Sequence, residues 1–342
     1  MPNQTNTPKL RLSVLDQAPV SAGSSGSQAL RYSLDLAQLA DRLGYHRYWV
    51  AEHHGAAGLA CTSPEVLVGP IATVTSRIRV GSGGVMLPHY SPLKVAEQFS
   101  MLSGLYPGRI DLGIGRAAGT DPVTTTALRR DREHRMPDDF TQQLNELLAY
   151  LWNQMPADHP FARLTALPGL PEIPVPWMLG SSPQSGIWAA EMGLPYMFAD
   201  FINPDGADVA RRYCQRFVPS DTLATPSVGV AVQVICADTD EAAERISTSY
   251  RMRVVQMHTG HRLDAVPSIE TALRFFADSG ITSDIGHFGR RVIVGSAATV
   301  RQQIETVAAE YQADEVMIVS TIFEHGARRR SYELIADAFR LV

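Results

Sequence analysis

Residues 78–116 read IRVGSGGVMLPHYSPLKVAEQFSMLSGLYPGRIDLGIGR, and this stretch decides the fold class. Its two ends, 78–86 and 109–116, are short apolar runs that predict buried strands. Residues 92–105 lie between them and predict a helix. Parallel strands require such a crossover connection, so the stretch predicts one strand–helix–strand unit of a parallel sheet.

The same succession continues in both directions along the chain. Strands are predicted at 10–16, 45–52, 78–86, 109–116, 176–180, 196–200, 228–237 and 315–320. Helices are predicted after them at 29–44, 64–76, 92–105, 140–152, 184–192, 204–217, 240–257 and 328–339. Eight such units favour a closed (β/α)8 TIM barrel in the α/β class, formed as a single domain over residues 1–342. An open doubly wound sheet is the structural alternative, and it usually has five or six strands and a recognisable dinucleotide turn.

Two segments fall outside this rhythm. Residues 1–9 are polar, lack the apolar core of a signal peptide and predict a disordered tail. Residues 258–291 carry a short helix at 268–279 and a glycine-rich stretch, and they precede a helix at 297–311. We interpret 258–291 as an insertion before the last unit, and our hypothesis is that it forms a lid over the active site.

Composition excludes several classes of function. The 342 residues hold 30 Lys and Arg against 35 Asp and Glu, a formal net charge of −5, which argues against nucleic-acid and anionic-membrane partners. No run of 18 apolar residues occurs, so no transmembrane helix is expected. The three cysteines, Cys61, Cys214 and Cys236, form no C-x-x-C pair and fit a reducing compartment. We therefore expect a soluble, cytoplasmic protein.

In a TIM barrel the active site lies at the carboxyl ends of the strands, so polar residues there are candidates. The second strand ends in Glu52-His53-His54. Adjacent strand residues point to opposite faces, so these three do not ligate one metal together. One histidine could face the barrel mouth and transfer protons, since imidazole titrates near neutral pH. The alternative is a loop histidine with a structural hydrogen bond.

Glycines and one arginine mark the next two strand ends. The glycines of 81–84 lie in mid-strand and indicate either the close approach of a flat ligand or a tight barrel corner. The fourth strand ends at Gly115-Arg116, and its G-x-G-x-x-x-G spacing departs from the dinucleotide fingerprint. Arg116 is a cation that could clamp a phosphate, and a surface salt bridge is the alternative.

The fifth strand ends in Gly180-Ser181-Ser182 before a helix. Serine there is ordinary N-cap chemistry, but the same geometry offers N–H groups and hydroxyls to an anion. With Arg116 on the neighbouring strand, the sequence predicts a phosphate site between strands four and five. His258, His261 and His287 are more often incidental than ligands, so we predict no metal. No G-x-S-x-G elbow or P-loop occurs to support a hydrolase or kinase.

Together these motifs resemble the bacterial luciferase-like, flavin-dependent monooxygenases, and the closest branch is that of the luciferase-family oxidoreductases, some of which act in secondary metabolism. The resemblance covers Leu12 to about Ala338. It is carried by the order and spacing of 49–54, 80–88, 107–116, 179–182, 193–195 and 294–296.

The resemblance implies a TIM barrel that binds FMN as FMNH2, supplied by a separate flavin reductase. Reduced FMN would react with O2 to give a flavin C4a-peroxide, which transfers one oxygen atom to a small-molecule organic substrate. The resemblance also implies a homodimer. The substrate itself, an aldehyde, a ketone or a polycyclic aromatic, cannot be identified from one sequence.

The resemblance also implies roles for individual residues. His53 matches the histidine beside the flavin and is our candidate for the catalytic residue that governs proton transfer. Gly83 and Gly84 occupy the place of a non-prolyl cis peptide that lies against the flavin ring. The remaining candidates are cofactor-binding: the phosphate contacts Arg116, Arg135, Gly180, Ser181 and Ser182, and the aromatic Phe201 near the flavin.

Two departures from the luciferases limit what is implied. Gly115 replaces a cysteine near the flavin, and Ser181 replaces an acid, so light emission from a long-chain aldehyde is not implied. Two alternatives stay open: a hydride-transfer oxidoreductase that uses the deazaflavin F420, and a non-catalytic flavin-binding protein on a degenerate barrel.

Overall fold

A computed structural model describes residues 10–116, 121–128, 138–169, 172–260 and 265–342. Arg135, His261 and the predicted tail at 1–9 lie outside these described residues. The strands are β1 (Arg11–Asp16), β2 (Arg47–Val50), β3 (Arg79–Met86), β4 (Ile110–Gly115), β5 (Val175–Gly180), β6 (Tyr196–Ala199), β7 (Val228–Cys236), β8 (Ile293–Gly295) and β9 (Glu315–Val319).

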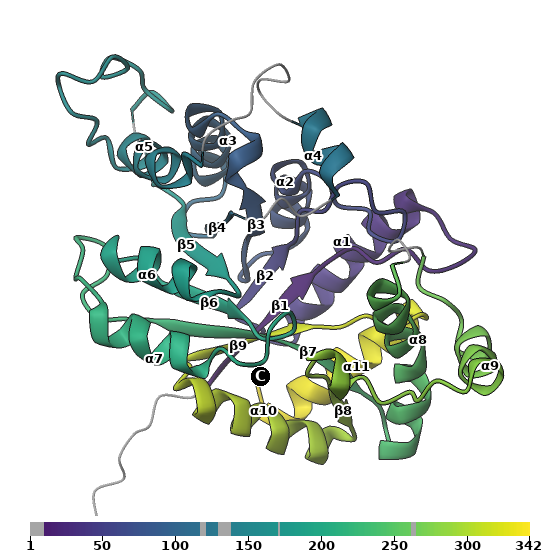
Figure 1. Ribbon diagram of the computed structural model, residues 1–342. Coiled ribbons are helices and arrows are strands. Elements are labelled where there is room, and N and C mark those ends of the chain that lie inside the picture. Colours follow the sequence, from purple (N-terminus) through teal and green to yellow (C-terminus); the bar gives the residue numbers. More distant parts are fainter. Residues whose placement is uncertain (1–9, 117–120, 129–137, 170–171, 261–264) are drawn as a thin grey trace, which may run out of the picture.

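Eight of these strands form a closed parallel barrel (Figure 1). From β1 to β7 each strand pairs with the next one along the chain, β7 pairs with β9, and β9 returns to β1. All eight predicted strands are present, and the predicted TIM barrel is confirmed. One strand, β8, lies outside the barrel and was not predicted from the sequence. It pairs with the last three residues of β7, beyond the part of β7 that pairs with β9.

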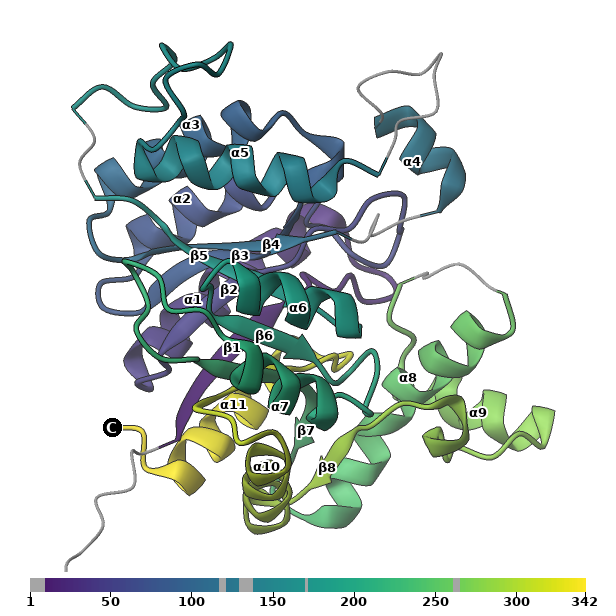
Figure 2. The same cartoon turned by 60° about the vertical axis from the view of Figure 1, so that its left-hand side comes forward.

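Helices surround the barrel (Figures 1 and 2). They are α1 (Gly26–Arg42), α2 (Pro64–Val74), α3 (Pro92–Leu105), α4 (Pro122–Leu128), α5 (Phe140–Trp152), α6 (Pro183–Glu191), α7 (Ala207–Arg216), α8 (Asp240–His258), α9 (Ile269–Ser279), α10 (Ala297–Tyr311) and α11 (His325–Phe339). Short 3-10 turns occur at η1 (Leu87–His89) and η2 (Gly286–Phe288). Helix α4 was not predicted from the sequence.

The chain makes its long excursion from the barrel between β7 and β9. In the ring of helices the place next to α7 and α11 is taken by α10, which contacts both. The helix predicted at 240–257 exists as α8, but it packs against α9, β8 and η2, so the excursion begins at α8. Figure 2 shows α4, α8 and α9 on the same side of the barrel. The lid role of 258–291 stays a prediction.

The amino-terminal half of the barrel interior is filled by a buried ion cluster. Arg47 at the start of β2 donates hydrogen bonds to Asp111 and Glu315, at 2.7 Å in each case. Arg79 also pairs with Asp111, at 2.6 Å. Burial opposes ionisation of Asp111, but Arg47 and Arg79 together hold the pKa of this carboxyl below its ordinary value.

Two tryptophans complete this filling. Trp49 donates its indole N–H to Asp111 at 3.0 Å, and the Arg47 guanidinium lies 4.6 Å from the centre of the Trp177 ring. The two indoles meet edge to face at 5.4 Å. The interior above them, toward the carboxyl ends of the strands, is where the barrel opens.

Candidate active site

A cavity of about 680 Å³ lies at the carboxyl ends of the strands. Its size falls in the range typical of small-molecule sites. Apolar side chains from six strands or the residues just after them form much of its wall: Leu15, Ala51, Leu179, Met197, Ala231 and Met317. Every predicted site residue that the structure describes also lines it: His53, Gly83, Gly84, Arg116, Gly180, Ser181, Ser182 and Phe201. The sequence prediction therefore selected residues that the fold brings to one place.

Glycines on β3 leave the cavity wall bare. The Gly83–Gly84 peptide bond is cis, and the pairing with β4 shifts register between Gly83 and Val85. A Cβ atom on Gly83 would lie 2.5 Å from Leu15 Cδ1, and one on Gly84 would lie 2.6 Å from the carbonyl oxygen of Gly113. The backbone contact requires glycine at position 84, and the absence of side chains at both positions exposes backbone to the cavity.

One end of the cavity combines a cation with a helix amino terminus. Arg116 is exposed, forms an ion pair with Asp138 and lies 5.6 Å from the centre of the Trp188 ring. Ser182 is the N-cap residue of α6, but its side chain makes no capping hydrogen bond. Helix N–H groups, serine hydroxyls and a guanidinium are the kinds of group that bind anions in proteins. Both interpretations of Arg116, the surface ion pair and the anion clamp, fit this geometry.

The structure separates the three polar residues at the end of β2. Glu52 is buried and accepts hydrogen bonds from His54 Nε2 at 2.8 Å, the Met86 amide at 3.0 Å and the Tyr90 hydroxyl at 2.9 Å. His54 is thus held in a structural network. His53 instead lines the cavity, and its buried Nδ1 has no hydrogen-bond partner among the described residues.

We expected a histidine at this position to titrate near neutral pH. The pKa of the His53 imidazole is instead well below that range. Burial lowers its pKa to about 4, and the charge of Arg253 and the neighbouring His54 add to the shift. His53 is therefore neutral at pH 7. A neutral imidazole carries one N–H donor and one acceptor nitrogen, so it can hold a proton in place without carrying charge.

A smaller chamber of about 220 Å³ adjoins the cavity and shares Gln17, His53, Phe201 and Ile202 with it. Its other polar lining was missed by the sequence analysis: Gln233, Tyr250, Arg253, Arg290 and Thr321. Gln17 and Thr321 closely follow β1 and β9, so reading every strand end would have found them. Tyr250 and Arg253 come from α8, whose orientation no strand-end rule predicts.

Asp200 directly precedes Phe201 and is fully buried. Its Oδ2 accepts a hydrogen bond from the Tyr311 hydroxyl at 2.9 Å and lies 3.5 Å from Arg291. Burial raises the pKa of Asp200 to about 6, although Arg291 and Tyr311 act in the opposite direction. This carboxyl therefore titrates close to the physiological range.

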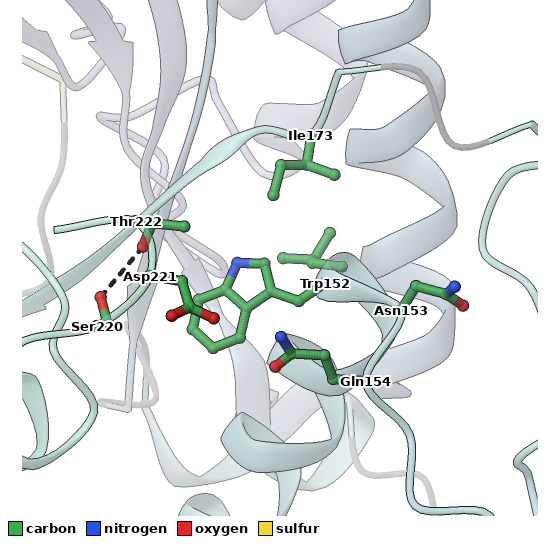
Figure 3. A pocket seen from close by; sticks show the side chains of 8 residues that line it. Trp152, Asn153, Gln154, Ile173, Ser220, Asp221 and Thr222 are labelled. Carbon is green, nitrogen blue, oxygen red and sulfur yellow. Dashed lines mark hydrogen bonds between the residues drawn. The ribbon is translucent and has the colours of Figure 1, made fainter.

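A third hollow, of about 450 Å³, lies away from all these residues (Figure 3). It is lined by Trp152 at the end of α5, by Ile173 before β5 and by Ser220 to Thr222 after α7. These segments precede strands or end helices, so the hollow lies at the amino-terminal end of the barrel. It holds none of the predicted site residues.

Within the described ranges, no group of three or more His, Cys, Asp or Glu side chains is arranged to hold a metal ion. No helix in that part of the chain is long and apolar enough to cross a membrane.

Comparison with known proteins gives consistent sequence relatives. A family model described as "Luciferase-like monooxygenase" matches residues 10–315. The "Uncharacterized protein YwcH" of Bacillus subtilis is 45% identical over 96% of this chain and 98% of its own length. A "Luciferase-like monooxygenase" of Escherichia coli is 41% identical over 96% of both chains. The "N-acetyl-S-alkylcysteine monooxygenase" of B. subtilis is 36% identical over 96% of this chain and 98% of its own.

Solved structures of similar fold include monooxygenases as well. The crystal structure of apo-MsnO8 matches with a TM-score of 0.88 and 40% identity over 98% of this chain and 99% of that one. Two others share only the fold. The oxygenating constituent of 3,6-diketocamphane monooxygenase from Pseudomonas putida, in complex with FMN, has a TM-score of 0.70 at 20% identity, covering 97% and 98% of the two chains. An F420-dependent secondary alcohol dehydrogenase has a TM-score of 0.67 at 12% identity, covering 97% and 99%.

Proposed function

This chain belongs to the family of luciferase-like monooxygenases, and on that premise we propose that it oxygenates a small organic molecule with O2 and reduced FMN. The observation that carries the proposal is the composition of one cavity. An anion site closes one end, apolar side chains and bare glycine backbone form its walls, and a neutral, buried histidine faces into it. A flavin mononucleotide presents the matching chemistry: a phosphate, and a flat ring.

The residues present fit FMN at both ends. Arg116, Ser181 and Ser182 would bind the phosphate, and Asp138 would release the guanidinium to do so. The bare backbone at Gly83 and Gly84 and the aromatic side chain of Phe201 would contact the ring. When bound, reduced FMN supplies the electrons that activate dioxygen at its C4a position.

The protein itself would exclude water and control one proton. Leu15, Met197 and Met317 present no hydrogen-bonding groups, so water is poorly held beside the ring. His53, neutral at pH 7, can donate a hydrogen bond from one ring nitrogen and accept at the other. We propose that it holds the proton needed when one oxygen atom leaves as water.

Two partners belong to the proposal. A separate reductase would deliver FMNH2 in the cytoplasm. The predicted homodimer would form through α2 and α3, which pack against each other and expose Val66, Met101 and Leu105. If so, sedimentation equilibrium should give twice the chain mass, and Met101→Glu combined with Leu105→Glu should give the monomer.

Rapid mixing with oxygen tests the function. The protein with reduced FMN is mixed with air-saturated buffer and the flavin spectrum is recorded, followed by hydrogen peroxide release with and without candidate substrates. An N-acetyl-S-alkylcysteine is one candidate, because a 36% identical relative is named for it. We expect flavin reoxidation slower than in free solution, and substrate oxygenation at the expense of peroxide.

His53→Gln should release more peroxide and oxygenate less substrate than the wild type. Reoxidation at the free-flavin rate, with all the oxygen recovered as peroxide whatever substrate is added, would refute the proposal. Binding of reduced F420 in place of FMN would favour hydride transfer instead.

A further inference from the structure

The smaller chamber lies on the side of the flavin cavity away from the proposed phosphate site. Gln17, His53, Phe201 and Ile202 line both spaces, whereas Arg116, Ser181 and Ser182 line only the larger one. Helix α8 forms one wall of the chamber with the side chains of four residues: Tyr250, Arg253, Val254 and Met257. A molecule that enters the chamber would therefore lie next to His53 and beyond the reach of the phosphate site.

Two arginines line the chamber. Arg253 is buried on α8, and Arg290, which precedes β8, donates a hydrogen bond to the Phe201 carbonyl at 2.8 Å. No Asp or Glu occurs among the described residues that line the chamber. The charge of Arg253 reaches His53, because it is one cause of the lowered pKa of that imidazole. Burial raises the pKa of Tyr250 to about 12, and both arginines oppose the rise, so both act on the same hydroxyl.

A neutral donor also points to a ligand. Gln233 projects from β7, is 1% exposed, and its side-chain Nε2 has no acceptor among the described residues. A buried N–H group without an acceptor is unfavourable, and most such groups in folded proteins have a partner. An anionic acceptor in the chamber would satisfy Gln233 and pair with guanidinium groups at the same time.

The volume and the remaining walls restrict what fits. About 220 Å³ admits a small anionic group with a few carbon atoms, and Leu59, Val254 and Met257 give those atoms an apolar surface. A carboxylate suits this combination because it accepts two parallel hydrogen bonds from one guanidinium.

We propose that this chamber binds the carboxylate of a small organic acid and thereby holds the apolar remainder of that substrate beside His53 and the flavin ring. The inference deepens the proposed function and rests on it for the statement that the bound acid is the substrate. The binding of the acid itself rests only on Gln233, Tyr250, Arg253 and Arg290.

Isothermal titration calorimetry at pH 7.5 tests the site with a matched pair of probes, hexanoate and hexanamide, which differ chiefly in charge. The protein is titrated with and without FMN. Hexanoate should bind roughly tenfold or more tightly than hexanamide, the range expected of hydrogen bonds to a charged group. Arg290→Gln and Arg253→Gln should each remove most of that preference.

Arg245→Gln is the matched control. It removes an arginine from the same helix, but Arg245 is exposed, lies 3.7 Å from Glu270 and does not line the chamber. This variant should keep the wild-type preference. Thermal unfolding of every variant verifies that the chain is folded.

The proposal is overturned if the two probes bind equally, if neither binds at millimolar concentration, or if both chamber variants keep the preference. Inorganic phosphate that displaces hexanoate at lower concentration than acetate does would overturn the assignment to a carboxylate. Selective hexanoate binding without FMN binding would leave the anion site standing and refute the flavin function. FMN binding with equal probe affinities would refute the anion site and leave the flavin function standing.

Discussion

The two halves of the barrel interior differ in the side chains that they contain. The amino-terminal half is filled by Arg47, Asp111, Glu315 and two tryptophans, with the charges satisfied internally. The carboxyl half is emptied by glycine on β3 and β4 and lined by apolar side chains. A closed barrel of eight strands has room for side chains and little more, so a cavity forms only where side chains are left out. Stability and binding are thereby assigned to different ends of the same strands.

This division predicts that variants in the filled half change the free energy of unfolding. Asp111→Asn keeps the side-chain volume but leaves Arg47 and Arg79 facing a neutral amide in a buried site. Removing one partner of a buried ion pair is expected to destabilise the fold by about 3–5 kcal/mol. Urea unfolding measures the effect.

The control for this variant is Arg211→Ala, which breaks an exposed pair with Asp208 and should change stability by less than about 1 kcal/mol. Equal effects of the two substitutions would show that the buried cluster does not support the barrel.

The second prediction concerns a glycine of the emptied half. In Gly84→Ala the new methyl would lie 2.5 Å from Leu179 Cδ1 and 2.6 Å from the Gly113 carbonyl. Overpacking of this kind destabilises by about 1–3 kcal/mol, and the shifted wall should also weaken FMN binding. Gly326→Ala, where a Cβ meets nothing within 4 Å, should change neither quantity appreciably. Unchanged FMN affinity in Gly84→Ala would separate this strand from the ligand.

The third prediction concerns affinity alone. Arg116 is exposed, so Arg116→Ala should leave the unfolding free energy unchanged and weaken FMN binding roughly tenfold or more, the range for a hydrogen bond to a charged group. Riboflavin, which lacks the phosphate, should bind both proteins equally. Asp138→Asn should strengthen FMN binding, because it frees the guanidinium. Fluorescence titration distinguishes these outcomes, and an equal loss for riboflavin would contradict the phosphate assignment.

The fourth prediction concerns the pH dependence of stability at Asp200, beside the cavity wall. Its pKa is about 6 in the folded chain and near 3.8 when unfolded, so between these values the folded state binds more protons. Stability from this group is therefore present below about pH 4 and lost as the pH rises through about 6. Asp200→Asn should flatten the stability profile in that window, by about 1.4 kcal/mol per unit of pKa difference. Profiles of the two proteins that run parallel would show that Asp200 titrates normally.

Sequence reasoning predicted the barrel because buried parallel strands are short apolar runs between helices. It missed β8, whose three residues are too few to show a period, and α4, which has seven. It found His53, Arg116, Ser181 and Ser182 because the fold fixes where strands end. It could not predict the role of Arg253 or the lowered pKa of His53. Arg253 acts on His53 because α8 packs beside the cavity, and no pattern in the sequence indicates how α8 is placed.

We propose that the glycine-emptied half of the barrel is a site for reduced FMN. Anaerobic equilibrium titration with reduced FMN, and in parallel with reduced F420, tests it most directly. We predict saturable binding of one reduced FMN per chain, weakened both by Arg116→Ala and by Gly84→Ala, with little binding of F420. Binding of F420 alone, or reduced FMN binding that both substitutions leave unchanged, would contradict it.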